Sequence, residues 1–398
     1  MTQSENVKDY LLPGETTYDQ AISRALAANN CAHFPAGQYT VNSSIVVQNG
    51  QGLRGDGSAV TTIICNDPEA PVVLIGSQIY SFEVIGLELS HINPAPGGDG
   101  IAMGQSDIDW IDSGIIEDVI AHNNYAGFNL GKAFYAEVIS CEAIANLSDG
   151  WRFTTTGVAV TPPGATGGPL QWYLYSCESN SNKGNGYAFA VTGTAYGPPC
   201  AGSSVGTLSG CITYANGIDG VSFAGTEEHP LNSARLYGGF FGNDARNGIF
   251  LNTFARDHVI SPDFVEQSGA NNIFISGHNA NTNVSVKQCS AAKWDGLKSY
   301  GDNTQITGGN FVNNGLSPGA YAGIHIAGGS ATVTGVTSRN WNSTFQSYGL
   351  WADVDDVIHS GCRFPDPNTL SKASGKINGS IGNLVQVGNS VSGIWFTS

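Results

Sequence analysis

Positive charge is scarce in this sequence. Its 398 residues hold 16 Lys and Arg against 32 Asp and Glu, which gives a net charge of −16. A surface of this sign repels phosphates and anionic lipid headgroups, which argues against nucleic acid and membrane surfaces as partners. No apolar run reaches a membrane-spanning length, and the first ten residues are polar. We therefore predict neither membrane insertion nor a signal peptide, and the route of export stays open.

Closely spaced cysteine pairs are absent. Structural zinc sites use CxxC pairs, so the spacing of the eight cysteines argues against zinc. Calcium loops need regularly alternating acidic residues, and the run at Asp353, Asp355 and Asp356 lacks that spacing. We predict no metal and no cofactor.

Glycine is abundant, at 53 positions, and charged residues make up only 12% of the chain. This composition is too apolar for a disordered chain and too rich in glycine for a helical protein. It favours an all-β fold.

A polar residue, a glycine and an apolar residue recur as a unit, for example at Asp149-Gly150-Trp151 and Asn185-Gly186-Tyr187. The recurring glycines at 100, 127, 150, 186, 220 and 248 are separated by 23 to 36 residues. Asn or Asp before glycine is typical of turns, and this period is that of one solenoid coil.

Two columns of residues keep a fixed distance from these glycines. The first lies nine residues before the glycine and contains Cys141, Cys177 and Cys211. The second lies four residues before it and contains Asn123, Asn146, Asn182, Asn216 and Asp244. The columns predict a right-handed, single-stranded parallel β-helix of about 10 to 12 coils, in which like residues stack on like residues. We interpret the cysteines as small buried apolar residues and the asparagines as a hydrogen-bonded ladder.

The two ends differ from the repeat. Thr17-Tyr18-Asp19-Gln20 fits a capping box, and Ala21, Ile22, Ala25 and Leu26 fall on one helical face. We predict an N-terminal segment with a capping helix at 1–30, the β-helix at 31–365, and a closing or oligomer-contact segment at 366–398. A cap is expected because the first coil would otherwise expose its apolar interior.

The opening of the chain carries a family resemblance. Phe34-Pro35-Ala36-Gly37-Gln38-Tyr39-Thr40-Val41 and Leu53-Arg54-Gly55-Asp56-Gly57 resemble the start of the pectate-lyase-like β-helix superfamily. Asn6-Val7-Lys8-Asp9-Tyr10 is similar to the entry into bacteriophage tailspike β-helices. The resemblance implies an extracellular or virion-associated protein that processes polysaccharide, commonly as a homotrimer with a glycan groove along the helix. It leaves the chemistry open, because the superfamily includes lyases, hydrolases, epimerases and adhesins.

Three neighbouring coils carry inserted loops, at 154–170, 192–206 and 225–232. They share one angular position, so we expect them to form a wall beside a substrate groove. The alternative is that these are merely tolerated surface loops.

Glu142 and Glu178 each follow a column cysteine. If the cysteines point inward, strand alternation places both carboxylates outward on adjacent coils. Such neighbours repel, so one can hold a proton as general acid while the other stays ionised, which is the equipment of a glycosidase. An ordinary solvated pair is the alternative. Further catalytic candidates are Glu227, Asp244, Asp263 and Glu266, with Asp244 alternatively a ladder residue.

Sugar binding calls for flat apolar faces and hydrogen-bond donors. The candidates on or beside the inserted loops are Trp151, Arg152, Trp172, Tyr173, Tyr187, Tyr196 and His229. The aromatic ones fit the interior of a β-helix equally well.

The function predicted from these observations is an endo-acting glycoside hydrolase on a bacterial extracellular polysaccharide. A lyase or epimerase acting on uronates is the first alternative, disfavoured by the few Lys and Arg residues. A non-catalytic glycan-binding spike or adhesin is the second.

Overall fold

The computed structural model describes residues 5–103, 110–155, 170–191, 203–227, 230–252, 254, 256–339, 346–354, 356–364, 375–377, 385–387 and 390–391. The chain divides into two compact units, unit 1 at Met1–Cys211 and unit 2 at Ile212–Ser398. Each unit is built from coils of three short strands, and each strand pairs in parallel with its counterpart in the next coil. The predicted parallel β-helix is therefore confirmed.

The coils of unit 1 present three faces. The first face contains β2 (Cys31–Phe34), β5 (Gly52–Gly55), the first part of β8 (Glu83–His91) and of β10 (Ile111–His122), β12 (Ala133–Ile139), β15 (Leu170–Tyr175) and β18 (Ser203–Ser209). The second face contains β3 (Gly37–Val41), β6 (Thr61–Cys65), the last parts of β8 and β10, β13 (Glu142–Ile144) and β16 (Glu178–Asn180). The third face contains β4 (Ile45–Val47), β7 (Val73–Ile75), β9 (Ile101–Met103), β11 (Phe128–Leu130), β14 (Trp151–Thr155) and β17 (Tyr187–Val191).

Unit 2 has the same three-strand coil. One set of paired strands is β21 (Leu231–Asn232), β22 (Arg235–Tyr237), β25 (Val259–Ser261), β28 (Asn283–Val284), β31 (Thr304–Thr307), β34 (Ala331–Thr334), β37 (Val357–Ser360) and β40 (Val385–Val387). A second is β19 (Ile212–Tyr214), β23 (Phe240–Gly242), β26 (Phe264–Glu266), β29 (Gln288–Ser290), β32 (Asn310–Val312), β35 (Thr337–Arg339), β38 (Arg363–Phe364) and β41 (Ser390–Val391). The third is β20 (Val221–Ala224), β24 (Ile249–Asn252), β27 (Ile273–Ile275), β30 (Leu297–Ser299), β33 (Tyr321–Ile326), β36 (Gln346–Ala352) and β39 (Gly375–Ile377).

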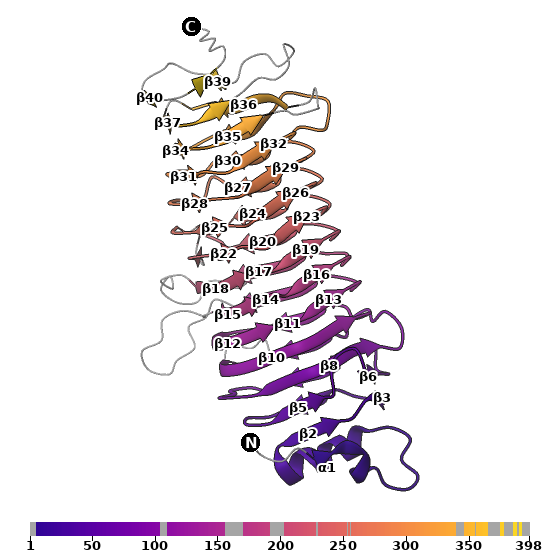
Figure 1. Cartoon of the computed structure of the whole chain (residues 1–398). Coiled ribbons are helices and arrows are strands. Elements are labelled where there is room, and N and C mark those ends of the chain that lie inside the picture. The colour runs from indigo at the N-terminus through magenta and orange to yellow at the C-terminus, as the bar shows by residue number, and fades with distance from the viewer. Residues whose placement is uncertain are drawn as a thin grey trace. The chain divides into compact units, whose positions relative to one another are not determined.

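The N-terminal end of unit 1 is covered by a short helix, α1 (Asp19–Asn29), after β1 (Glu5–Asn6) and the 3-10 turn η1 (Val7–Tyr10). The helix packs on β2, as Figure 1 shows, and buries the predicted apolar face at Ala21, Ile22, Ala25 and Leu26. The capping box was not found, because the N-cap residue Tyr18 makes no side-chain cap. The Asp19 carboxylate instead accepts hydrogen bonds from the backbone of Asn42 and Ser43.

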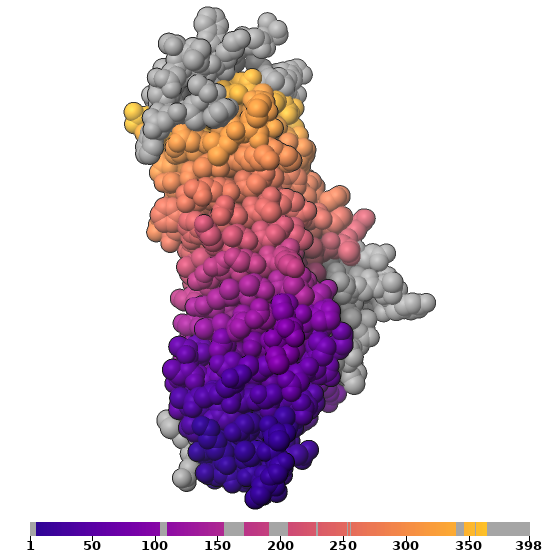
Figure 2. Space-filling view, turned by 90° about the vertical axis from the view of Figure 1, so that its right-hand side faces the viewer, coloured from indigo at the N-terminus to yellow at the C-terminus, as the bar shows by residue number. Residues whose placement is uncertain are grey.

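The interior of unit 1 is filled by fully buried apolar side chains, and the indigo to magenta atoms of the unit form a continuous surface on the face seen in Figure 2. The third face contributes a stack of fully buried aromatic rings. Trp151 lies 3.7 Å from Phe128 and 5.8 Å from Tyr187 between ring centroids, in nearly parallel planes. Repeating the same register in every coil places like residues in contact, which is why this stack forms.

The predicted cysteine column is buried, with Cys141, Cys177 and Cys211 all at 0% exposure. Their thiols donate to backbone carbonyls, for example Cys177 Sγ to Val138 O at 3.4 Å. Burial raises the pKa of the Cys177 thiol, which keeps it protonated. These residues therefore pack as small side chains of the core, as predicted.

The asparagine ladder is present in unit 1, with one correction. Asn124 N donates to Asn146 Oδ1 at 3.1 Å, and Asn146 Nδ2 donates to Asn182 Oδ1 at 2.8 Å. The ladder residue of the first of these coils is thus Asn124, so the assignment of Asn123 was wrong. Each ladder residue follows a left-handed residue, and Asn123, with a φ of 57°, occupies that preceding position. A turn shorter by one residue in this coil caused the error.

Candidate functional site

Glu142 and Glu178 lie side by side on the second face of unit 1. They are directly paired between β13 and β16, so their Cα atoms are about 4.8 Å apart, one strand spacing. The following residues, Ala143 and Ser179, point inward and are fully buried, while both glutamates are half-buried. The structure therefore brings together the two carboxylates on which the sequence prediction depended.

The surroundings of Glu142 act on its pKa in one direction. Burial raises the pKa of Glu142, and the negative charges of Glu178 and Asp118 raise it further. The Glu178 side chain accepts a hydrogen bond from Asn180 Nδ2 at 3.3 Å. Asp118 is held by Ser58, whose hydroxyl donates to it at 2.6 Å. The surroundings of Glu142, burial first and neighbouring carboxylates next, therefore favour its neutral form.

Asp244 is not a catalytic residue, and that prediction was wrong. Its side chain is 1% exposed and accepts hydrogen bonds from Asn216 Nδ2 at 2.9 Å and Thr213 Oγ1 at 2.9 Å. Burial raises its pKa to about 7. A glycan cannot reach a side chain sealed inside the coil, so Asp244 serves as a ladder residue of unit 2.

The other carboxylate candidates of unit 2 occupy separate settings. Asp263 forms an ion pair with Lys287 at 2.6 Å. Glu266 accepts a hydrogen bond from Ser290 Oγ at 3.1 Å. Glu227 is exposed. A catalytic role for these three residues stays a prediction.

Three aromatic candidates for sugar binding are core residues. Trp151, Trp172 and Tyr187 are all 0% exposed. The indole nitrogens of Trp151 and Trp172 donate to the carbonyls of Glu178 and Gly131. Their assignment to a sugar-binding surface was wrong, because strand alternation turns each of them toward the interior, where rings of successive coils stack.

Arg152 points outward from β14 but is already engaged. Its guanidinium pairs with Asp149 at 3.1 Å, donates to Ser148 Oγ at 2.7 Å and lies over the ring of Tyr125. Asp149 in turn accepts from the backbone of Asn185, as expected for a turn residue. Arg152 thus braces a turn, while Tyr196 and His229 lie outside the described residues, as does most of the first two inserted loops.

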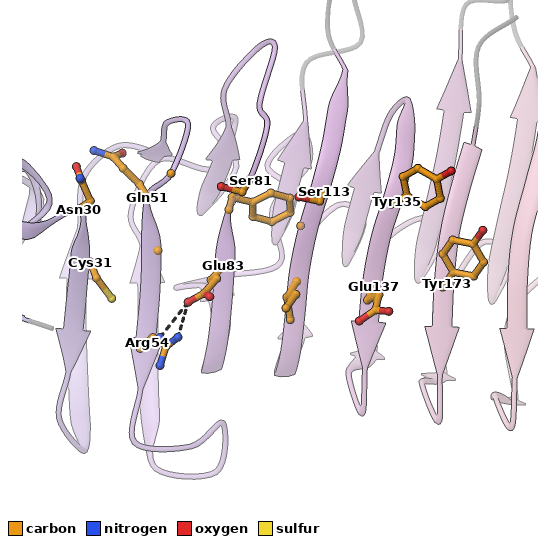
Figure 3. Close-up of a pocket in the computed structure, with 15 residues that line it drawn as sticks. Asn30, Cys31, Gln51, Arg54, Ser81, Glu83, Ser113, Tyr135, Glu137 and Tyr173 are labelled. Carbon is orange, nitrogen blue, oxygen red and sulfur yellow. Dashed lines mark hydrogen bonds and ion pairs between the residues drawn. The ribbon is translucent and has the colours of Figure 1, made fainter. Parts of the chain in front are cut away.

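The first face of unit 1 holds a groove that the sequence analysis missed. Its volume is about 690 Å³, and it crosses the outer surface of strands β2, β5, β8, β10, β12 and β15. Figure 3 shows Tyr135, Glu137 and Tyr173 on neighbouring strands at one end and Arg54 with Glu83 nearer the other. We call this cavity the first-face groove; its remaining lining residues are Asn30, Cys31, Gly50, Gln51, Gly52, Ser81, Phe82, Ser113, Gly114 and Ile115.

Strand register fixes the order of side chains in the first-face groove. Glu83 pairs with Ile115, Ile115 pairs with Glu137, and Glu137 pairs with Tyr173. Arg54 donates to Glu83 through Nε at 3.1 Å, and this partner raises the pKa of the guanidinium. Tyr135 is 65% exposed.

A signal for the groove was present in the alternation of strand β12. Tyr135 and Glu137 fall on the side opposite to the buried Ala136 and Val138. Of the aromatic candidates, Tyr173 points outward into this groove because the preceding Trp172 points inward.

No cluster of residues suited to hold a metal ion occurs among the residues that the structure describes. Within the same part of the chain, no helix is long and apolar enough to cross a membrane. Asp353, in the acidic run considered for calcium, accepts hydrogen bonds from His325 Nε2 at 2.9 Å and Trp351 Nε1 at 2.7 Å.

The fold is similar to that of solved parallel β-helix proteins. The A-module of mannuronan C-5 epimerase AlgE4 from Azotobacter vinelandii matches with a TM-score of 0.62 and 17% identity, over 98% of this chain and 100% of that one. Tailspike protein 3 of bacteriophage CBA120 matches with a TM-score of 0.60 and 12% identity, over 98% of this chain and 62% of that one. Gene product 12 of bacteriophage phi29 matches with a TM-score of 0.66 and 14% identity, over 96% of this chain and 56% of that one.

No protein-family model matches the sequence, and no curated protein matches it significantly. The structural matches confirm the resemblance seen in the opening motifs at the level of fold. Identities of 12 to 17% carry no statement about chemistry.

Proposed function

We propose that this β-helix protein is an endo-acting glycoside hydrolase of a bacterial extracellular polysaccharide. The observation that carries the proposal is the stacked carboxylate pair, in which burial and like charge raise the pKa of Glu142 beside Glu178. Glycoside hydrolysis needs such a pair, one member protonated and one ionised, on either side of the scissile bond.

In this mechanism Glu142 donates its proton to the glycosidic oxygen as the bond to the leaving sugar breaks. Glu178 stabilises the positive charge that develops on the sugar ring and attacks the anomeric carbon, which forms a glycosyl ester. Glu142, now ionised, then takes a proton from a water molecule that attacks the same carbon, so the ester bond breaks and both carboxyl groups return to their starting forms. A single strand spacing between the backbones is closer to the separation of about 5 to 5.5 Å that retaining enzymes use than to the wider inverting one. We therefore expect the product to keep the anomeric configuration of the substrate.

The test uses Glu142→Gln and Glu178→Gln on the full chain with a panel of bacterial exopolysaccharides. We expect each variant to lose at least about 100-fold in the rate at which new reducing ends appear, because a positioned acid or base contributes on that scale. Glu69→Gln is the matched control, since Glu69 is an exposed carboxylate of unit 1 that belongs neither to the Glu142 and Glu178 pair nor to the first-face groove. Wild-type rates in both pair variants would refute the assignment.

The uronate lyase or epimerase remains the alternative enzyme. It needs cationic side chains to neutralise the substrate carboxylate. Among the described residues that line the first-face groove, Arg54 is the one cation, and it is already paired with Glu83, which counts against a lyase or epimerase. Ultraviolet absorbance of an unsaturated product, read on the same fractions, separates elimination from hydrolysis.

A glycan-binding protein without hydrolase activity is the second candidate, favoured by the first-face groove with its outward tyrosines. Glycan retention without any shortening of the chains would support it.

The chain is also proposed to act outside the cell or on a virion, as a homotrimer. Unit 2 supports a subunit contact through an outward apolar row in which Ile212, Phe240 and Phe264 are in register. Ile212 and Phe264 are 38% and 41% exposed. Exposed apolar rows are typical of subunit interfaces. Light scattering gives the mass that decides between monomer and trimer.

A further inference from the structure

The first-face groove contains one carboxylate that no residue described by the structure neutralises. Glu137 is exposed, and among the described residues it has no hydrogen-bond or ion-pair partner. Arg54 forms no ion pair with Glu137, because its guanidinium is paired with Glu83 and is also attracted by Glu117. The groove therefore keeps a net negative charge at its Glu137 end.

The surroundings of Glu137 are aromatic and apolar. Tyr173 lies directly opposite Glu137 on the next strand, and Ile115 lies opposite on the other side. Tyr135 precedes Glu137 by two residues on the same strand and so projects from the same side. A carboxylate beside two tyrosines offers a charge partner for a cation and ring faces for both a sugar and an ammonium group.

Three classes of glycan would interact differently with this arrangement. A uronate would bring its carboxylate beside Glu137, and the two like charges would repel. A neutral sugar would stack on the tyrosines but leave the carboxylate without a charge partner. An amino sugar with a free ammonium group satisfies both parts, since the charged N–H group donates to the carboxylate while the ring stacks.

We propose that the first-face groove binds a glycan containing amino sugars with free ammonium groups, with the ammonium at Glu137 and the sugar ring against Tyr135 or Tyr173. This proposal adds a substrate class to the proposed function. It rests on that function in one respect, namely that the ligand is a glycan. Binding in this groove does not depend on the Glu142 and Glu178 carboxylates.

The test is isothermal titration of three oligosaccharides of equal length: glucosamine, N-acetylglucosamine and galacturonate oligomers. It uses the full chain carrying Glu142→Gln and Glu178→Gln, so that cleavage cannot interfere. We expect the glucosamine oligomer to bind at least about tenfold more tightly than its acetylated counterpart, the effect of one charge-assisted hydrogen bond. The galacturonate oligomer should not bind.

Adding Glu137→Gln to this background should remove the tenfold preference and leave the acetylated oligomer unchanged, while adding Glu69→Gln should change neither. Tyr173→Ala should weaken both amino-sugar oligomers. Thermal unfolding of each variant reports whether it is folded. Four outcomes would each overturn the proposal. The free and acetylated oligomers could bind equally, galacturonate could bind more tightly than glucosamine, or no oligomer could bind. The preference could also survive Glu137→Gln. The loss of hydrolysis in the pair variants is measured separately, so the two proposals fail independently.

Discussion

Unit 1 carries two groups of outward carboxylates, and they differ in their neighbours. On the second face Glu142 stands beside Glu178 in the next coil, and burial first, then the like charges of Glu178 and Asp118, raise the pKa of Glu142. On the first face Glu83 is paired with Arg54 from the preceding coil, while Glu137 is left without a charge partner between a tyrosine and an isoleucine. The same coil geometry thus favours a neutral carboxyl in one place and leaves an unpaired carboxylate in the other, and the residue in the adjacent coil contributes to the difference.

Reversing the charge of Glu178, the neighbour of Glu142, should have the largest effect on the difference between the two carboxylate groups. Glu178→Arg places a guanidinium beside Glu142 and should lower its pKa below the ordinary range, because an opposite charge favours the ionised form. We expect the rate of glycan hydrolysis to fall at least about 100-fold, since the acid loses its proton and its partner together. NMR titration of Glu142 measures the pKa, and a value that does not fall would contradict the electrostatic account.

Asp244 extends the comparison to the interior of the coil, where burial, together with the negative charge of Asp219, raises its pKa to about 7. A raised pKa means that stability is fully present below the unfolded-state value and is lost as pH rises through about 7. Asp244→Asn removes this loss and should stabilise the protein above that pH by about 4 kcal/mol, since the pKa is raised from 3.8 to about 7 and each pKa unit corresponds to about 1.4 kcal/mol.

Urea unfolding of wild type and Asp244→Asn on both sides of that pH checks this prediction. The difference in free energy of unfolding should grow as pH rises. A constant difference would mean that the Asp244 proton does not contribute to folding.

Removing the partner of Arg54 should have the smallest of the three effects. Glu83→Gln frees the guanidinium and takes one negative charge from the first-face groove. We expect affinity for galacturonate oligomers to appear or rise by about tenfold, as for one new charge-assisted hydrogen bond. Titration of the oligomers at two salt concentrations checks the change, which should diminish at higher ionic strength.

The coil repeat can be predicted from the amino-acid sequence. The glycine period, the buried cysteine column and the pairing of Glu142 with Glu178 all follow from alternation along a strand and stacking between coils, which are local rules. The helical face at Ala21 to Leu26 was predicted in the same way.

Errors arose where a turn changed length or a residue fitted two environments. The ladder position moved from Asn123 to Asn124 because one coil has a shorter turn, which composition does not reveal. Trp151 and Tyr187 suit a sugar or a core stack equally, and only the register with Phe128 placed them inside.

The order of residues along the chain is therefore enough to predict the coil, its period and the alternation of residues within each strand. Tertiary structure alone decided which outward residues share a surface. The first-face groove joins Arg54, Glu83, Glu137 and Tyr173, which are far apart in the chain and meet because successive strands stack about 4.8 Å apart. Whether a carboxylate there is neutralised depends on the residue one coil away, and that neighbour is fixed by the length of every intervening loop.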